Sequence, residues 1–435
     1  MVESSQPLAL DAAAHESADS SCEMTAARRW AAVVLLTLVA ILNYIDRFLP
    51  SVLAEPIKRD LALSDTAIGL INGFGFLIIY AVLGIPIARL ADRGRQGLVI
   101  TTCLGLWSAM TMLGGFAQSG WQLALTRMGV AVGEAGSTPA AHAFIARSFP
   151  PARRAAPLAV LTLSAPLATM LALIGGGLVA SALGWRNTFL VMGAASLLTA
   201  PLVLVTLGAG RGPAHAADGG AAAGFGAYRG LLRKQSFALI LVASSAIGIG
   251  SYALTAFGPA FLMRVHGLSV AQVGVEFGLA SGVAGALALA LVGVVADRLS
   301  SRDPRWHLWA VAAMVALFTP CTLAALLVEN GRPALVLLAI GNAFGAAYLA
   351  PLVAAIQRLA PVELRASASA IMLFCTAVLG GLGPLIAGMI SDALQPELGA
   401  AALARGMLVA PIAWGAGGLL YLAATRRFRT EMADE

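Results

Sequence analysis

The segment RSFPPARRAAP at residues 147–157 has a counterpart, RLAPVELRASA, at residues 358–368. The same spacing relates GGLVASAL at 176–183 to AGMISDAL at 387–394. Both members of each pair flank long apolar runs, so the similarities fall at equivalent places in the chain. They predict two related halves, and parallel repeats of this kind are typical of membrane transporters whose substrate site lies between the halves.

The composition indicates a membrane protein. Of 435 residues, 59% are hydrophobic and 11% are charged, with a mean hydropathy of +0.84. Soluble domains are about one quarter charged, and an apolar run of about 20 residues crosses a bilayer as a helix. We therefore expect an all-α integral membrane protein with twelve transmembrane helices, at about 30–53, 66–90, 98–117, 121–147, 155–183, 187–209, 236–263, 271–296, 307–328, 333–357, 366–393 and 403–425.

The longest interruption between apolar runs divides the chain into two six-helix bundles. It begins as a Gly/Ala/Pro-rich stretch, which is typical of a flexible linker. Its end, YRGLLRKQ at 228–235, favours a short basic amphipathic helix on the membrane surface. The expected organisation is a disordered tail at 1–29, bundles at 30–209 and 236–425, a linker at 210–235 and a second tail at 426–435.

The excess of basic over acidic residues reflects the orientation of the chain in the membrane. The net charge is +6 and the pI is about 9.5, but Lys and Arg concentrate in the tails and in alternate connections, as in RR at 28–29 and at 153–154. Cytoplasmic loops of membrane proteins carry this excess. We expect both termini in the cytoplasm, a bacterial inner membrane location and no nucleic-acid partner.

The chain carries no pattern that is typical of an enzyme or a channel. It has no HExxH sequence, no nucleotide-binding loop, no nucleophile–base set and no filter loop, and its four cysteines are scattered. We expect no catalytic residues, no metal and no cofactor. A monomeric secondary transporter in the lipid bilayer, with a small molecule and protons as partners, remains the favoured class.

Four charged residues lie deep inside apolar runs of the first half, away from the ends of those runs. Asp46 and Arg47 belong to NYIDRFLP, and Arg127 and Glu134 belong to RMGVAVGEAG. Unpaired charges at this depth cost from about 2.5 to more than 10 kcal/mol. Asp46 and Arg127 lie roughly 10 Å and roughly 9 Å from the same membrane surface, so an ion pair between them is possible.

Glu134 lies two helical turns beyond Arg127 and on nearly the same face, which favours a vertical pair with Asp46 competing for the arginine. We predict that Asp46, Arg127 and Glu134 form a proton-coupling set, because burial and a nearby guanidinium both control protonation of a carboxyl. The alternative is a structural link between two helices. Arg47 is predicted to bind an anionic group of the substrate, or to contact backbone carbonyls instead.

Other polar residues within the apolar runs are candidates for lining a substrate cavity. Each of them is equally compatible with a hydrogen bond between helices. They are Asn43, Tyr44, Asn72, Tyr80, Tyr252, Asn342 and Tyr348.

ARLADR at 88–93 and its repeat GVVADR at 293–298 resemble the loop motif of the major facilitator superfamily. The resemblance covers residues 30–425 and implies that family's fold of two pseudo-symmetric six-helix bundles. It also implies a cytoplasmic gate held by charged residues near the two copies of the motif and the matching loops. The gate residues expected on this basis are Asp92, Arg93, Asp297, Arg298, Arg154 and Arg365.

NYIDRFLP together with GVAVGEAGSTPAAHAFIARSFPPARRA resembles the Spinster branch of that superfamily. This likeness implies proton-coupled transport of an amphipathic or anionic molecule of the lysolipid or sphingolipid kind. The anion:cation symporter branch, which carries sugar acids and other organic anions, is a second possibility. A drug/proton antiporter is a third, although the GP…GG motif of those proteins is missing from the run at 155–183.

Overall fold

The computed structural model describes residues 25–92, 96–150, 153–208 and 225–432, and all regular structure in these ranges is helical. Serine side chains cap several helix starts: Ser64, Ser119 and Ser269 accept hydrogen bonds from backbone N–H groups of the turn that follows. Helices end where glycine adopts positive φ, as at Gly208 (77°).

The first half of the described chain forms the N-terminal bundle. Its helices follow one another with short connections. They are α2 (Ala26–Asp60), α3 (Asp65–Gly69), the π-helical turn η2 (Leu70–Phe74), α4 (Gly75–Asp92), α5 (Gln96–Gly114), α6 (Gly120–Glu134), α7 (Ser137–Ser148), α8 (Ala155–Thr162) and α9 (Ser164–Leu207).

The second half begins with α10 (Phe225–Arg233) and continues as the C-terminal bundle. The bundle consists of α11 (Gln235–Arg264), α12 (Val270–Gln272), the π-helical turn η4 (Val273–Phe277), α13 (Gly278–Ser300), α14 (Trp306–Leu327), α15 (Gly331–Ala347), α16 (Leu349–Leu359), η5 (Val362–Leu364), α17 (Arg365–Gly380), α18 (Leu382–Leu398), η6 (Gly399–Ala401), α19 (Ala402–Met407) and α20 (Val409–Glu431).

Nine helical segments of the described chain are long and apolar enough to cross a membrane. Two of them are far longer than one crossing needs: 155–207 has 53 residues and 367–431 has 65. Each is interrupted by a glycine with positive φ, at Gly184 and Gly399. The pair α6–α7 supplies a further crossing between 120 and 148. Counted in this way, the structure contains the twelve crossings that the sequence predicts.

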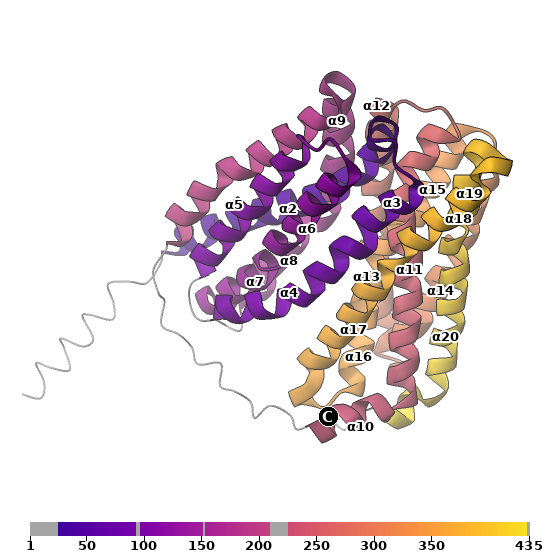
Figure 1. Cartoon of the computed structure of the whole chain (residues 1–435). Helices are drawn as coiled ribbons and strands as arrows, with labels where there is room; N and C mark the ends of the chain where they lie inside the picture. The colour runs from indigo at the N-terminus through magenta and orange to yellow at the C-terminus, as the bar shows by residue number, and fades with distance from the viewer. Residues whose placement is uncertain (1–24, 93–95, 151–152, 209–224, 433–435) are drawn as a thin grey trace, which may run out of the picture.

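The two bundles meet at one end and diverge at the other (Figure 1). At the end that carries α3, α12 and α19, which we call the α3 end, α3 packs against α18 and α9 packs against η4. At the opposite end, which carries α10 and which we call the α10 end, the two sets of helices separate. The flanks of the molecule carry exposed apolar side chains, including Leu198 (74%) and Leu419 (69%).

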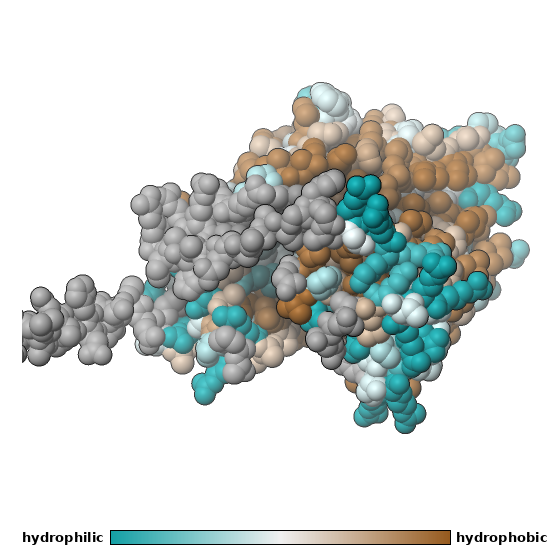
Figure 2. Space-filling model, turned by 90° about the horizontal axis from the view of Figure 1, so that it is seen from below, coloured by the Kyte–Doolittle hydropathy of each residue, from teal (hydrophilic) through white to brown (hydrophobic). Residues whose placement is uncertain are grey.

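Viewed from the α10 end, hydrophilic residues gather on that face while apolar residues cover the adjoining flank (Figure 2). Large exposed apolar surfaces are unfavourable in water. The apolar flank and the hydrophilic end face are the arrangement expected of a protein surrounded by lipid.

The short helix predicted at the end of the linker is present as α10, which begins at Phe225, ends at Arg233 and buries Leu231 (3% exposed). One boundary differs from the sequence prediction. Helix α20 continues beyond 425 to Glu431, because Phe428 packs in the core (0% exposed) and the Glu431 carboxylate accepts hydrogen bonds from the first backbone N–H groups of α11, at 3.2 and 2.7 Å. The predicted tail at 1–29 lies mostly outside the described residues.

Close packing of α5 and α9 within the N-terminal bundle generates a stability prediction. A Cβ atom on Gly193 would lie 2.6 Å from the Met112 side chain and 2.8 Å from the Ser108 carbonyl oxygen. Gly193→Val should therefore destabilise the bundle by about 1–3 kcal/mol through overpacking, measured as a lower thermal unfolding midpoint in detergent. Gly105→Ala is the control, because no atom lies within 4 Å there. An equal loss in both variants would contradict the packing.

Candidate functional site: four charges within the N-terminal bundle

Asp46 on α2 forms an ion pair with Arg127 on α6. The Arg127 Nη1 atom lies 3.4 Å from Asp46 Oδ1, and both side chains are 4% exposed. The hydroxyl of Thr111 on α5 donates a hydrogen bond to Asp46 Oδ2. Both carboxylate oxygens of Asp46 therefore have a donor, and the contact joins three helices. The structure contains the pair that the matching depths allowed.

Arg47, the next residue along α2, pairs with Glu134 at the end of α6. Its Nη2 and Nε atoms lie 2.8 and 3.2 Å from Glu134 Oε2. The expected vertical pair between Arg127 and Glu134 is thus wrong. With Arg127 bound to Asp46, Glu134 would be a buried charge without a counterion unless Arg47 turned toward it, and an unpaired buried charge is strongly unfavourable.

The two ion pairs differ in how far their side chains are exposed to solvent. The Glu134 side chain is fully buried, whereas Arg47 is 19% exposed and is the most accessible of the four charged side chains. Glu134 Oε1 has no hydrogen-bond partner among the described residues. A buried polar atom without a partner is uncommon and needs an explanation, such as a bound water, an ion or a functional role.

Aromatic rings surround the Arg47 guanidinium. Its Cζ atom lies 4.4 Å from the ring centroid of Tyr80, 5.5 Å from that of Tyr44 and 5.6 Å from that of Phe76. Rings at this distance attract a cation. Tyr252 from α11 packs against the hydrophobic core of the N-terminal bundle, so a residue of the C-terminal bundle contacts the bundle that holds the site.

The remaining four predicted lining residues make no described contact with the four charged side chains. Asn43 is buried, with its Nδ2 atom 3.5 Å from Ser137 Oγ, as in a contact between helices. Tyr348 packs against Phe344 in the core of the C-terminal bundle, with the rings tilted and their centroids 5.4 Å apart. Asn72 and Asn342 are half-buried, and the structure gives neither a contact with the four charges.

Of the predicted cytoplasmic gate, the structure describes the side chains of Arg154, Arg298 and Arg365, so the gate as a whole stays a prediction. Arg154 donates to the carbonyls of Phe149 and Ala146, both in its own bundle, at 3.0 and 2.5 Å. Arg298 is exposed and Arg365 is half-buried. Arg93 and the side chains of Asp92 and Asp297 lie outside the described residues.

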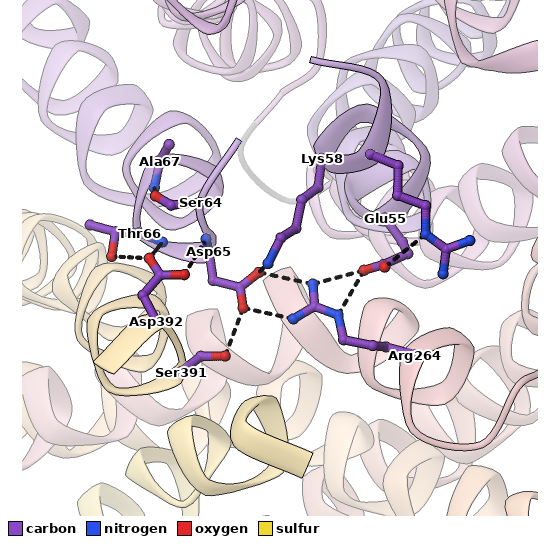
Figure 3. Close-up of polar contacts among 10 residues, drawn as sticks. Glu55, Lys58, Ser64, Asp65, Thr66, Ala67, Arg264, Ser391 and Asp392 are labelled. Atoms are coloured by element: carbon purple, nitrogen blue, oxygen red, sulfur yellow. Dashed lines mark hydrogen bonds and ion pairs between the residues drawn. The ribbon is translucent and has the colours of Figure 1, made fainter. Parts of the chain in front are cut away.

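A second group of charges, which the sequence analysis did not single out, joins the bundles at the α3 end (Figure 3). We call it the α3-end cluster. It consists of Glu55, Lys58 and Asp65 of the N-terminal bundle with Arg264, Ser391 and Asp392 of the C-terminal bundle. Lys58, Asp65 and Arg264 lie in the first or last turn of a helix, where charges are common, so composition and periodicity gave no signal for the cluster.

Comparison with known proteins identifies the family. The family model described as Major Facilitator Superfamily matches residues 36–384, which is most of the chain. The chain belongs to the Major Facilitator Superfamily. This confirms the predicted fold, and the apolar flanks with nine spanning segments in the described chain make it an integral membrane protein.

Several proteins similar to this chain carry the names of transporters. An "MFS-type efflux pump" of Mycolicibacterium smegmatis is 54% identical over 94% of this chain and 95% of its own length. "Protein spinster" of Drosophila melanogaster is 27% identical over 63% of this chain but only 47% of its own length. A crystal structure of a bacterial homologue of the human lysosomal transporter Spinster, inward-facing and unoccupied, covers 94% of this chain and 100% of its own, with 28% identity and a TM-score of 0.84. The likeness to the Spinster branch is thus confirmed.

The pairing of the four charges can be tested by double-mutant cycles. Asp46→Asn with Arg127→Gln, and Arg47→Gln with Glu134→Gln, should each show a coupling free energy of about 1–3 kcal/mol in thermal or denaturant unfolding, because each pair shares direct contacts.

The control cycle combines Arg127→Gln with Glu134→Gln, whose coupling should be smaller than that of either pair. A larger coupling in the control cycle would restore the vertical pair and refute the pairing described above.

Proposed function

We propose that this facilitator is a proton-coupled secondary transporter that carries an amphipathic or anionic small molecule by alternating access. The observation on which the proposal depends is the contact between partly exposed Arg47 and fully buried Glu134, whose second oxygen has no partner. A guanidinium that an anion can reach and a carboxylate that can take a proton are the two groups that such coupling requires.

We assign different roles to the two ion pairs. Asp46 accepts hydrogen bonds on both oxygens, and its pair with Arg127 is closed to solvent, so it serves as a structural link between α2, α5 and α6. Glu134 has one free oxygen, which makes it the better proton acceptor. Coupling is therefore assigned to Glu134 with Arg47, and Asp46 with Arg127 holds α2 in place.

Proton and anion binding would favour each other at this site. Glu134 binds Arg47 through its negative charge, and protonation removes most of that attraction. The freed guanidinium can then form two parallel hydrogen bonds to a carboxylate or phosphate. An anionic molecule and a proton would thus occupy the same conformation and cross together, which is symport.

The distribution of basic residues supports an orientation. Arg229 and Arg233 are exposed on α10 or at its end, and Lys234 follows. By the positive-inside tendency the α10 end faces the cytoplasm together with both termini, and the bacterial relatives support an inner membrane location. The α3 end then faces outward, and the conformation corresponds to an inward-facing one.

Names of relatives support two anionic substrate classes. A "Sphingosine-1-phosphate transporter SPNS2" of Xenopus tropicalis is 28% identical over 62% of this chain, and a "Probable galactarate/D-glucarate transporter GudP" of Bacillus subtilis is 30% identical over 41%. Both names describe molecules with phosphate or carboxylate groups. The rings of Tyr44, Phe76 and Tyr80 around Arg47 favour the amphipathic class.

The efflux name of the 54% identical relative supports a second candidate, a proton-driven exporter. A cationic cargo would pair with the Glu134 carboxylate and would have to leave when a proton binds there. Cargo and proton would then occupy the site in turn, which is antiport. The charge of the transported molecule therefore separates the two candidates.

Transport by purified protein in proteoliposomes tests the proposal. With sphingosine 1-phosphate, D-glucarate and a lipophilic cationic dye as probes, an imposed pH gradient should drive accumulation of an anion by the wild type. Glu134→Gln should reduce that accumulation at least tenfold while retaining exchange of the probe without a gradient, because the site keeps its shape and loses its proton acceptor.

Glu276→Gln is the matched control, because Glu276 lies in η4, near the start of the crossing at 270–300, and its one ion pair within the described residues is a long contact with Arg332, at 3.8 Å. It should transport as the wild type does. Gradient-driven movement of the dye alone would favour the exporter, and transport of the probes that ignores the gradient would refute proton coupling.

A further inference from the structure

A side pocket of about 140 Å³ lies beside the four charges, between α2, α7 and the junction of α8 with α9. These helices pack against one another within the N-terminal bundle (Figure 1). Tyr44 belongs to both places, because it lines the pocket and its ring also lies near Arg47. The pocket residues of α2, within 36–44, precede Arg47, and α2 runs toward α3, so the pocket lies on the side of Arg47 that faces the α10 end. A cavity of this volume can hold several water molecules or a small polar group.

A helix interruption forms one wall of the side pocket. Helix α8 ends at Thr162 and α9 begins at Ser164, and both residues line the pocket. Pro166 explains the interruption, because it has no N–H to donate to the carbonyl of Thr162 four residues earlier. Irregular backbone at membrane depth is tolerated where it is buried in protein or lines a cavity, and interrupted helices of transporters form binding sites. The position of the pocket is therefore that of a binding site.

Three polar side chains of the pocket are left as hydrogen-bond acceptors. The Nδ1 atom of His142 lies 3.0 Å from the carbonyl oxygen of Thr138. A carbonyl can only accept, so Nδ1 carries the proton, and Nε2 of the neutral ring keeps a lone pair. The hydroxyls of Thr162 and Ser137 donate to backbone carbonyls four and three residues earlier, at 2.8 and 3.3 Å. Each hydroxyl uses its only proton in that bond and can therefore only accept from a ligand.

The rest of the lining does not offset these acceptors. None of the described residues that line the pocket is Asp, Glu, Lys or Arg, and further walls are apolar, as at Val39 and Leu161. The hydroxyls of Thr138 and Ser164 can accept as well as donate. An ionised carboxylate or phosphate, which only accepts, would meet lone pairs here, whereas an ammonium group brings three donors and no acceptor. The ring of Tyr44 attracts a cation as well, so the pocket is complementary to an amine.

We propose that the side pocket binds an amino group of the cargo, with His142 and Thr162 as its specificity-determining residues. Tyr44 and Arg47 are separated by roughly 4.5 Å along the axis of α2, so one molecule can reach both. The favoured cargo is then an amphiphile with an acidic group at Arg47 and an amino group in the side pocket, rather than a plain organic acid. This inference rests on the proposed function for the place of the acidic group, whereas the pocket would hold the amine of a cationic cargo equally.

The preference for an amine can be tested by equilibrium binding of radiolabelled probes to the full-length protein in lipid nanodiscs, without a gradient. The probes are sphingosine 1-phosphate and its N-acetyl derivative, which share the phosphate and differ in whether the nitrogen is an ammonium group. The wild type should bind the amine at least tenfold more tightly. His142→Phe and Thr162→Val should each lower this ratio at least threefold, because each removes one acceptor. Thr162→Val nearly keeps the shape of the side chain and serves if His142→Phe does not fold.

Thr102→Val is the matched control. The Thr102 hydroxyl on α5 also donates to backbone carbonyls of its own helix, at 2.9 and 3.0 Å, but Thr102 does not line the pocket, so the ratio should stay that of the wild type. Equal affinities of the wild type for the two probes, no binding of either probe, or an unchanged ratio in both pocket variants would overturn the inference.

The binding experiment separates this inference from the proposed function, because it measures no transport. A protein that prefers the amine but moves it without regard to a pH gradient would refute proton coupling and leave the side pocket intact. A proton-coupled transporter that binds both probes equally would refute the side pocket alone.

Discussion

A charge at hydrocarbon depth must have a partner, and this requirement organises the N-terminal bundle. Two acids and two arginines on α2 and α6 form two ion pairs there, of which Asp46–Arg127 is closed on all sides and Arg47–Glu134 is reachable at the arginine. The cost of leaving any one of them alone is several kcal/mol. The nearly buried pair fixes α2 against α6, and the same two helices hold Arg47 against Glu134.

Helix α2 connects this site to the far end of the bundle. Arg47 and Glu55 lie on the same helix, roughly 12 Å apart along its axis. The C-terminal bundle contacts the N-terminal bundle through Tyr252 of α11, which packs against the hydrophobic core of the N-terminal bundle, and through Arg264 at Glu55. A movement of the bundles at one of these contacts therefore affects the other, because α11 carries both residues.

Much of the fold could be predicted from the sequence, because span length, charge asymmetry and repeated segments each have a physical cause that acts locally. The Asp46–Arg127 pair followed from depth alone. The direction of Arg47 did not, because neighbouring helical residues point about 100° apart and spacing does not say which of them turns toward α6. The α3-end cluster was not foreseen, because Asp65 and Arg264 are distant in sequence and helix-end charges are ordinarily solvated.

The π-helical turn η2, between α3 and α4, has a geometric consequence for the second crossing. A π-helical turn accommodates one residue more than an α-helical turn, so side chains beyond it are displaced by about 100° around the axis relative to an uninterrupted helix. Gly69 before the turn packs on Pro384 of α18, while Phe76 and Tyr80 after it face Arg47. The second crossing thereby packs on α18 before the turn, whereas beyond it α4 presents aromatic rings to Arg47 in its own bundle and keeps a contact with α17 of the opposite bundle. The wide turn makes it possible for one helix to do both.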